Sequence, residues 1–416
     1  MKAKYSFFVQ AATVVTVALF LGCRVRPDAP TARISAKIAP EQAEQNLSDW
    51  FDRAEIIELK GIQLANVQQV IIQDTMLIVR AQAANGWIHV FGRSGQYLGS
   101  LLPKGKGPRE AINVAQVSIV PDKSHTVAVL ANFGRHIMLC SLDSMQAVRK
   151  ITLPENVSGA VQMAAMEGDR YMLYKDYFFT DGPEFKLNLY DAATESVVGQ
   201  YLPLDKDVAR FLAFSQRNNL YRTQQGDIRF YETFGPGIFE YDPHRDSVSL
   251  YLRFDKGEYE FPQTLLEDGY ADLDAFLDVC LDQQRYIWAH VNCYETRNLV
   301  LSLYTYKKAN YLNIIDKRTG VSVSMPSVRD DLVTDASITP YRALPIGADD
   351  RHCILVAEPW ELIQTMNDKQ QAGALEAYKT RFPEFSRFIG GLDPDANPVL
   401  IILSECEPEA SNEEQR

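Results

Sequence analysis

A short apolar strand that ends in a polar turn recurs at nearly regular intervals along the chain. Six copies are recognisable, centred on Ile88, Ile137, Leu187, Ile238 and Leu312 and on residues 398–403. By subtraction, the first four copies lie 49, 50 and 51 residues apart, and the fifth follows after 74. A four-stranded unit near this length is typical of a propeller blade, whose strands stack radially. The sequence therefore predicts an all-β fold, a six-bladed β-propeller.

The segments around these copies have the pattern of half-buried sheet. Apolar and polar residues alternate in short runs rich in Val, Ile, Tyr and Phe, and turns with Gly, Asn and Asp separate the runs. The second blade is the clearest, with strands expected at residues 115–120, 126–130, 135–142 and 147–153. The sixth blade lacks a final strand. Residues 55–59 would supply it and close the ring, so we place the propeller at residues 51–410.

Two segments interrupt the β pattern with apolar residues at helical spacing, residues 263–284 and about 360–390. The first lies between the last strand of blade four and the first strand of blade five. The second lies between the second and third strands of blade six. Both connection types emerge on the same face of a propeller. We therefore expect two helical insertions on one face, forming a cap over one sector.

The N-terminus has the pattern of a lipoprotein signal. Lys2 and Lys4 precede an uncharged stretch, residues 6–22, which ends in a glycine followed by Cys23. A lipoprotein signal peptidase requires a small residue before a cysteine whose thiol accepts a diacylglycerol. The basic start, the apolar run and the small residue together predict lipid attachment at Cys23. The alternative is an uncleaved membrane anchor, because the run reaches the minimum length of a span.

This interpretation divides the start of the chain into two parts. Residues 1–22 are the predicted signal peptide, and residues 23–50, rich in Pro, Ala, Gln and Glu, are a predicted flexible tether. We expect the protein to be lipid-anchored at the outer membrane, and the sequence leaves its periplasmic or cell-surface face open.

Charge excludes some partners. The chain has 42 basic and 54 acidic residues, a net charge of −12. Nucleic acids and anionic lipids require a basic binding surface, so we expect neither as the main partner. The expected contact with a membrane is the N-terminal lipid alone.

The blade-one region resembles a known family. Residues 91–98 (FGRSGQYL) and 104–110 (KGKGPRE) are similar to the strand end and the Gly-x-Gly-Pro-x-Glu loop of the six-bladed β-propeller lipoproteins common in Bacteroidetes. Residues 132–137 also resemble the Asn-x-Arg-Ile core of NHL repeats. The resemblance covers most of residues 55–405. It implies a propeller fold and an envelope location, and it implies little about activity, because a propeller hosts many functions.

The loop at residues 104–110 is the first candidate site. Its two glycines and its basic residues Lys104, Lys106 and Arg109 suggest a phosphate-binding loop. The spacing from Gly99 is one residue too long for a P-loop, however, and no Ser or Thr follows Lys106. An inter-blade turn that needs its glycines is the simpler interpretation. We still expect the loop near the channel mouth, where its cations can meet an anionic ligand.

Histidines and cysteines predict neither a metal site nor a cofactor. No His pair has metal-ligand spacing. Apart from Cys23 there are five cysteines, an odd number without metal-type spacing. A disulfide between Cys280 and Cys293 is the one pairing that the sequence leaves as an alternative. Propeller enzymes can gather one histidine per blade at the axis. His290, in a predicted inner strand, is the best single candidate, although a structural histidine is the alternative. Arg135 and His136 are further ligand-binding candidates.

Three aromatic residues are candidates for recognition. Tyr177 and Phe178 lie in a predicted loop of blade three, and Trp360 begins the second helical insertion. Exposed aromatic rings would suit a sugar or a partner protein, and packing back onto the propeller is the alternative.

Taken together, these features predict a binding or scaffold module for a partner protein, glycan or peptide in the bacterial cell envelope. The alternative is a propeller hydrolase or lyase with an active site at the channel mouth. Two or more of His290, Arg135, His136 and Arg109 meeting in one pocket would favour catalysis.

Overall fold

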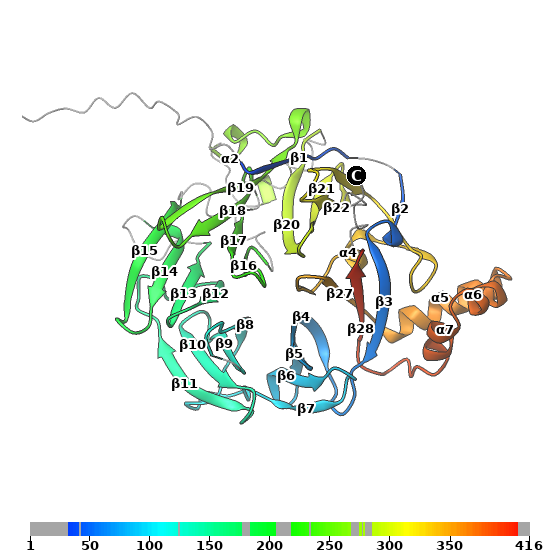
Figure 1. Ribbon diagram of the computed structural model, residues 1–416, viewed down its shortest axis with the longest axis horizontal. Coiled ribbons are helices and arrows are strands. Elements are labelled where there is room, and N and C mark those ends of the chain that lie inside the picture. Colours follow the sequence, from blue (N-terminus) through cyan, green and yellow to red (C-terminus); the bar gives the residue numbers. More distant parts are fainter. Residues whose placement is uncertain are drawn as a thin grey trace, which may run out of the picture. The chain divides into compact units, whose positions relative to one another are not determined.

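Seven sheets form a seven-bladed β-propeller around a central channel in the computed structural model (Figure 1). The structure describes residues 32–40, 43–123, 125–176, 184–204, 218–232, 234–267, 274–276, 278 and 285–406. The predicted signal peptide, Cys23 and the first part of the predicted tether lie outside these ranges. The folded unit begins at Ala32.

The first three blades each have four antiparallel strands that follow one another along the chain. Blade one comprises β4 (Ala65–Gln73), β5 (Met76–Ala83), β6 (Gly86–Gly92) and β7 (Tyr97–Ser100). Blade two comprises β8 (Val114–Ile119), β9 (Thr126–Ala131), β10 (His136–Ser141) and β11 (Gln146–Thr152). Blade three comprises β12 (Gln162–Met166), β13 (Arg170–Tyr174), β14 (Phe185–Asp191) and β15 (Ser196–Pro203). The four strands predicted for blade two are therefore confirmed.

Blades four and five also have four consecutive strands, with β1 added to the sheet of blade four, and blade seven takes its last strand from before blade one. Blade four comprises β16 (Leu220–Arg222), β17 (Ile228–Tyr231), β18 (Gly237–Asp242) and β19 (Ser247–Asp255). Blade five comprises β20 (Trp288–Glu295), β21 (Leu299–Tyr306), β22 (Ala309–Asp316) and β23 (Ser322–Met325). Blade seven comprises β26 (Gly347–Ala348), β27 (His352–Ala357), β28 (Val399–Glu405) and β3 (Phe51–Glu58).

The ring closes through the first strand of the propeller, as predicted. β3 pairs antiparallel with β28, with Ile57 opposite Leu400. The turn after β6 packs against this closing strand. Gly95 there has a φ of +85°, and a Cβ at this position would lie 2.1 Å from the Glu58 carbonyl oxygen. Only glycine fits this close contact between blades one and seven.

The prediction of six blades was wrong. A seventh sheet, blade six, lies between blades five and seven in the chain and has three strands: β2 (Gln45–Asn46), β24 (Val328–Asp330) and β25 (Ala336–Ile338). Strands of two or three residues are too short to show alternation, and β2 comes from a distant part of the chain. The sequence pattern therefore could not reveal this sheet.

Part of the predicted tether belongs to the folded unit. β1 (Ile34–Lys37) pairs in parallel with β19 at the outer edge of blade four, and β2 pairs in parallel with β24. Ala36 and Ile38 are buried there. Few large apolar residues occur in this segment, so its composition did not distinguish an edge strand from a linker.

The second helical insertion is confirmed as helical, with α5 (Pro359–Gln371), α6 (Leu375–Arg381) and α7 (Pro383–Gly390). Of the first, the structure describes α2 (Thr264–Glu267) and a few further residues. The expected common cap was wrong. Figure 1 shows α5–α7 outside β3 at the rim and α2 beside β1, at separate places on the circumference. The outward position has a physical cause, because Leu362 and Ile389 pack on the outer side of blade seven near Ile56.

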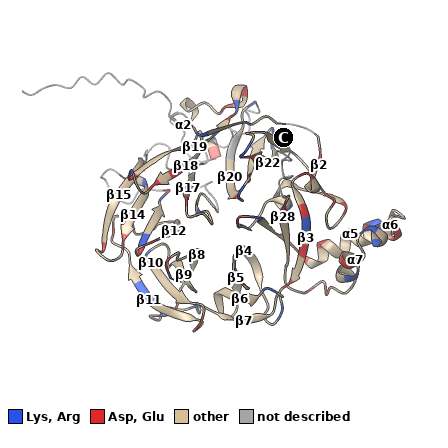
Figure 2. Ribbon diagram, viewed as in Figure 1, with Lys and Arg blue, Asp and Glu red and all other residues tan. Residues whose placement is uncertain are grey.

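Smaller helices connect the blades: the 3-10 helices Leu47–Asp49 and Gly257–Tyr259, and α4 (Pro340–Ala343). Figure 2 shows residues of both charge signs on α5–α7 and on the closing strand β3. Within the described ranges, no helix has the length and apolar content needed to cross a membrane.

The hydrophobic core is divided among the junctions between neighbouring blades. Between blades one and two, for example, Ile78 and Val90 pack with Val117 and Val129, all fully or almost fully buried. Such packing fixes each blade against its neighbours and leaves the innermost strands to line the channel.

Candidate functional site

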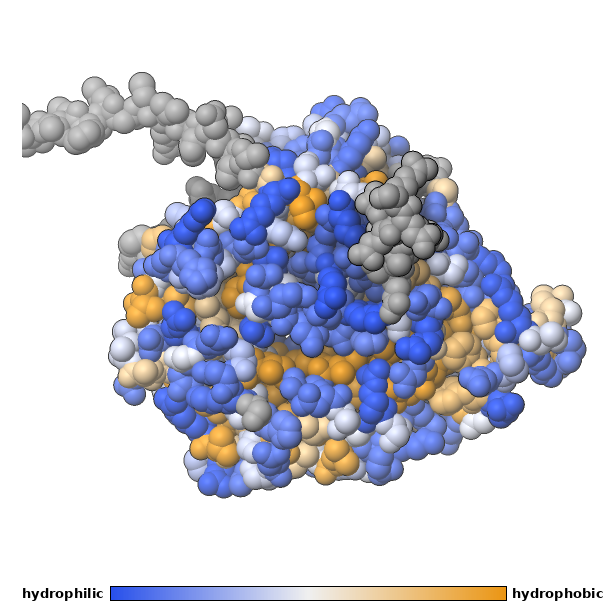
Figure 3. All heavy atoms as spheres, in the orientation of Figure 1, coloured by the Kyte–Doolittle hydropathy of each residue, from blue (hydrophilic) through white to orange (hydrophobic). Residues whose placement is uncertain are grey.

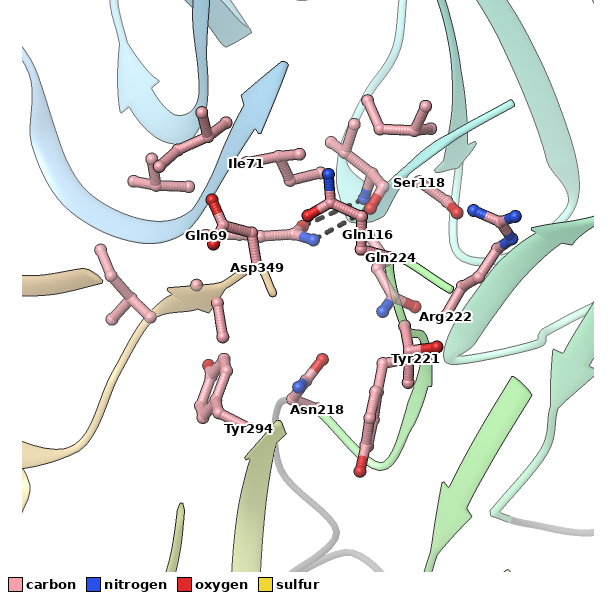
Figure 4. A pocket seen from close by; sticks show the side chains of 18 of the residues that line it. Gln69, Ile71, Gln116, Ser118, Asn218, Tyr221, Arg222, Gln224, Tyr294 and Asp349 are labelled. Carbon is pink, nitrogen blue, oxygen red and sulfur yellow. Dashed lines mark hydrogen bonds between the residues drawn. The ribbon is translucent and has the colours of Figure 1, made fainter. Parts of the chain in front are cut away.

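A cavity of about 200 Å³ lies in the central channel. Its walls come from the inner strands of blades one to five and seven, and from the turns that follow β16 and β26 (Figure 4). None of its lining residues belongs to the three strands of blade six. Six inner strands therefore build the walls of this cavity, and the strands of blade six do not contribute to them.

Glutamine side chains join the inner strands of neighbouring blades. The Gln69 carboxamide on β4 accepts a hydrogen bond from the Val117 backbone N–H (3.1 Å) and donates one to the Val117 carbonyl (2.9 Å). Dashed lines in Figure 4 mark these bonds. Gln116 on β8 accepts from the Met163 N–H of blade three (2.6 Å) and donates to the Leu220 carbonyl of blade four (3.1 Å). Each carboxamide retains one N–H and one lone pair.

The amide clamps continue around the channel. Gln162 on β12 accepts hydrogen bonds from the backbone N–H groups of Asn219 (2.8 Å) and Leu220 (2.7 Å). Asn218 donates to the Cys293 carbonyl of blade five at 2.6 Å. Side-chain amides thus supply hydrogen bonds between blades whose backbones belong to different sheets. The result is a polar lining with fixed geometry.

Apolar side chains form the other part of the wall. Ile71 and Ile72 on β4 and Ile119 on β8 line the cavity. Figure 3 shows a hydrophobic band across the centre of the molecule, over β4 and β8. The rings of Tyr221 and Tyr294 face the cavity from blades four and five. A wall with apolar, aromatic and amide groups can bind a ligand that has both carbon–hydrogen faces and hydrogen-bonding groups.

Both carboxylates that line the cavity already have partners. Glu295 accepts a hydrogen bond from the Tyr221 hydroxyl (3.0 Å) and pairs with the Lys317 ammonium (2.7 Å). Asp349 lies 2.9 Å from His352 Nδ1. Burial acts to raise the pKa of Asp349, but hydrogen bonds from His352 and from backbone N–H groups outweigh it and hold the pKa below its usual value.

Turns of blades four, five and seven meet at one end of the cavity. Asp350 accepts a hydrogen bond from the Gln225 side chain, and its backbone N–H donates to Gln224 (3.2 Å). Arg297 pairs with the same aspartate at 3.0 Å. These contacts tie three turns together across this mouth.

The predicted basic loop forms an inter-blade turn. Glu110 accepts a hydrogen bond from the Gly107 N–H (2.8 Å), and a Cβ on Gly105 would lie 1.9 Å from the same carboxylate. The Lys104 ammonium lies 4.7 Å from the centre of the Trp87 ring, and Arg109 donates to Gln146 at 2.9 Å. Lys106 is exposed. The loop borders the hairpin that carries Arg135 and His136, because the Ile112 N–H bonds to Asn132 at 2.8 Å.

The remaining predicted residues lie at separate places in the fold. Arg135 is exposed at the β9–β10 turn, and burial, together with Lys150 and Arg135, lowers the pKa of His136. Trp360 is 55% exposed at the start of α5. Tyr177, Phe178 and Cys280 lie outside the described residues. No described member of the predicted set lines the channel cavity.

His290 is buried between blades four and five. Its ring stacks on Tyr304 (5.1 Å between centroids) and lies 4.8 Å from Phe254. Neither ring nitrogen has a hydrogen-bond partner among the described residues. Burial, with a smaller effect of Lys256, lowers the pKa of His290 well below its ordinary value. Among the residues that the structure describes, no group of three His, Cys, Asp or Glu side chains is placed to hold a metal ion.

Sequence reasoning missed the residues that build the cavity. Gln69 and Gln116, which line the cavity, and Gln162 occupy the same place in three successive blades, each directly before an apolar residue. Comparing the blades on this position would have found the recurrent polar side chain in strands otherwise rich in apolar residues.

The radial sheets, the closing β3–β28 pair and the axial cavity define a β-propeller with a channel pocket. Family comparison gives the particular assignment: residues 31–404 match the model of the domain of unknown function DUF4934. Because the match spans most of the chain, the protein belongs to this family. No curated protein sequence matches the chain.

Solved structures support the fold. A crystal structure of "a putative exported protein" from Bacteroides fragilis matches with a TM-score of 0.66 and 14% identity, over 90% of this chain and 99% of that one. "Putative TolB" from Agrobacterium tumefaciens gives a TM-score of 0.35 at 10% identity, over 66% of this chain and 92% of that one. The WD40 domain of Toxoplasma gondii coronin gives 0.38 at 8%, over 68% of this chain and 66% of that one. The last two scores are too low to carry an argument.

Proposed function

We propose that the protein is an exported, lipid-anchored binding protein whose ligand, a glycan or peptide segment, enters the channel cavity. The observation that carries this proposal is the lining itself. Amide groups fixed by inter-blade hydrogen bonds lie beside isoleucine and tyrosine side chains in one cavity. A preorganised lining of this kind lowers the entropy cost of binding.

The enzyme alternative has less support. Its best candidates, His290, Arg135, His136 and Arg109, do not line the channel cavity. The two carboxylates that do line it, Glu295 and Asp349, are engaged by cationic or hydrogen-bonding partners. A general acid or base must be able to reach a reacting group, so this arrangement favours binding over hydrolysis or elimination.

The location part of the proposal rests on the N-terminal sequence. The basic start, the apolar run and Cys23 have the pattern of a lipoprotein signal. A Cys23→Ala variant should lose the lipid and appear in the soluble fraction of cells, whereas the wild type sediments with membranes. Membrane retention of the variant would refute the lipid anchor.

The binding part is tested with the full chain in mild detergent on arrays of oligosaccharides and peptides. Ala348 lines the cavity, so Ala348→Trp should fill it and abolish binding of every compound that the wild type retains. Ile71→Gln provides a second, smaller change of the lining. Val198→Trp, at a 49% exposed position on β15, is the matched control and should bind normally. Equal binding by wild type and both cavity variants, with melting temperatures unchanged, would refute the channel site.

A further inference from the structure

The charges that line the channel cavity are unequally compensated. The residues that line it include two acidic residues, Glu295 and Asp349, and one arginine, Arg222. Both carboxylates have partners within 3 Å. Among the described residues, no ion pair or side-chain hydrogen bond involves Arg222. The uncompensated charge of the cavity wall is therefore a cation.

Arg222 also occupies a distinctive place. It ends β16 and lines both the channel and a second cavity of about 470 Å³ between blades three and four. The side chain is half-buried, and burial lowers the pKa of its guanidinium, which still stays charged at neutral pH. Arg229, on the next strand of the same blade, shows the contrast, because it contacts Asp227 (3.1 Å) and Glu240.

We propose that Arg222 binds a carboxylate of the ligand, so that the channel recognises an acidic glycan or a peptide C-terminus. This inference rests on the proposed function and names the ligand class of the same site. A guanidinium presents parallel N–H donors that match the two oxygens of a carboxylate, and such bidentate contacts are stronger than neutral hydrogen bonds. The amide groups of the wall would bind the neutral part of the same ligand.

Two nearby acidic residues oppose this binding and set its strength. Glu167 and Asp227 both interact with the Arg222 charge at longer range. Asp227 is already engaged by Arg229, whereas Glu167 is exposed and borders the second cavity. Arg170 lines the second cavity but not the channel, which makes it a matched control cation.

The test measures binding of defined probes to the full chain by calorimetry. One arm compares trigalacturonic acid with its methyl ester, and the other compares a tripeptide carrying a free C-terminus with its C-terminal amide. The wild type should bind one acidic probe at least about tenfold more tightly than its neutral counterpart, the effect of one charge-assisted contact. The arm that responds identifies the source of the carboxylate.

Variants then assign the effect to one side chain. Arg222→Gln should weaken binding of the acidic probe by about tenfold or more and leave the neutral probe within about twofold. The affinity of Arg222→Lys for the acidic probe should lie between those of the wild type and Arg222→Gln, because lysine retains the charge without the paired N–H donors of arginine. Glu167→Gln should tighten binding of the acidic probe a few-fold, and Arg170→Gln should leave it within about twofold.

The outcomes separate this inference from the proposed function. Equal binding of acidic and neutral forms, or unchanged binding in Arg222→Gln, overturns the inference and leaves the channel site standing. If only neutral array compounds bind, the inference is likewise overturned and the channel site stands. If no array compound and no probe binds the wild type, both the inference and the proposed function fail.

Discussion

Two sectors of the propeller join their blades by different means. From blade one to blade four, neutral carboxamides connect one inner strand to the next, as Gln69, Gln116 and Gln162 do. Between blades four and five, charged side chains join the junction beside the Asn218 carboxamide. Arg229 contacts Glu240 and lies 3.6 Å from Glu295. Its guanidinium carbon also lies 3.8 Å from the centre of the Tyr251 ring.

The two kinds of junction differ in the free energy that it costs to bury their polar groups. A neutral amide needs only its hydrogen bonds to be satisfied, whereas a buried charge also loses its hydration. Arg229, Glu240 and Glu295 are each less than 10% exposed. Removing one amide should therefore leave a local defect, and removing one buried charge should leave its partners with less compensation in a medium of low dielectric constant.

The largest effect is expected from Arg229→Met. The substitution removes the buried cation that Glu240 and Glu295 share and leaves Arg33 and Lys317 as their remaining cationic partners, so the free energy of unfolding should fall by about 3 kcal/mol. Chemical denaturation measures this change. Arg245→Met, at a guanidinium that is 83% exposed, is the control and should change stability by less than about 0.5 kcal/mol. A loss below about 1 kcal/mol for Arg229→Met would show that the charge junction resembles the amide junction.

A smaller loss is expected from Gln162→Leu. The Asn219 and Leu220 backbone N–H groups would lose their acceptor while remaining buried, so stability should fall by about 2–3 kcal/mol. Gln370→Leu, on the exposed face of α5, is the control with the same chemical change. If both variants melt at the wild-type temperature, water replaces the amide and the clamp contributes no stability.

The sequence predicted the repeated part of this architecture better than its junctions. The strands of blade two, the closing strand at residues 55–59 and the helices at about 360–390 are local patterns, and all are found. Blade six was missed because its strands have two or three residues and β2 pairs with residues 283 positions away. The position of the helices depended on packing of Leu362 against blade seven, which no periodicity records.

The candidate site was less predictable than the fold. The sequence analysis selected basic and histidine side chains as candidates because catalysis and ligand binding commonly use them. The cavity is instead lined by glutamine, asparagine and isoleucine, residue types that occur on many strands. Arg222 could be singled out only after the ion pairs of the other cations were known, because pairing is a tertiary property.

The junction of blades four and five should also respond to pH through His290. Because burial holds its pKa well below 6.5, the native state keeps the ring neutral while the unfolded chain takes up a proton. Stability contributed this way is fully present above pH 6.5 and falls by about 1.4 kcal/mol for each pH unit below it. His290→Phe should remove this part of the slope in denaturation curves between pH 7 and pH 5. Parallel slopes for the two proteins would contradict a neutral buried ring.

The smallest effect is expected at the tied turns. Arg297 is 63% exposed at its side chain, so its ion pair with Asp350 is screened by solvent. Arg297→Ala should lower stability by no more than about 1 kcal/mol, measured by the same denaturation. A loss as large as that of Gln162→Leu would mean that the turns, rather than the inner strands, hold blades four, five and seven together.

The most direct test of the channel as a binding site is a crystal structure of the intact protein, soaked with the array compound that binds most tightly. The ligand is sought in the folded unit, residues 32–406. The account predicts ligand density between β4, β8 and β16, in contact with Gln69, Gln116 and the Tyr294 ring. Density at the loop of Lys104 and Lys106, or on α5 beside Trp360, with an empty channel, would contradict it.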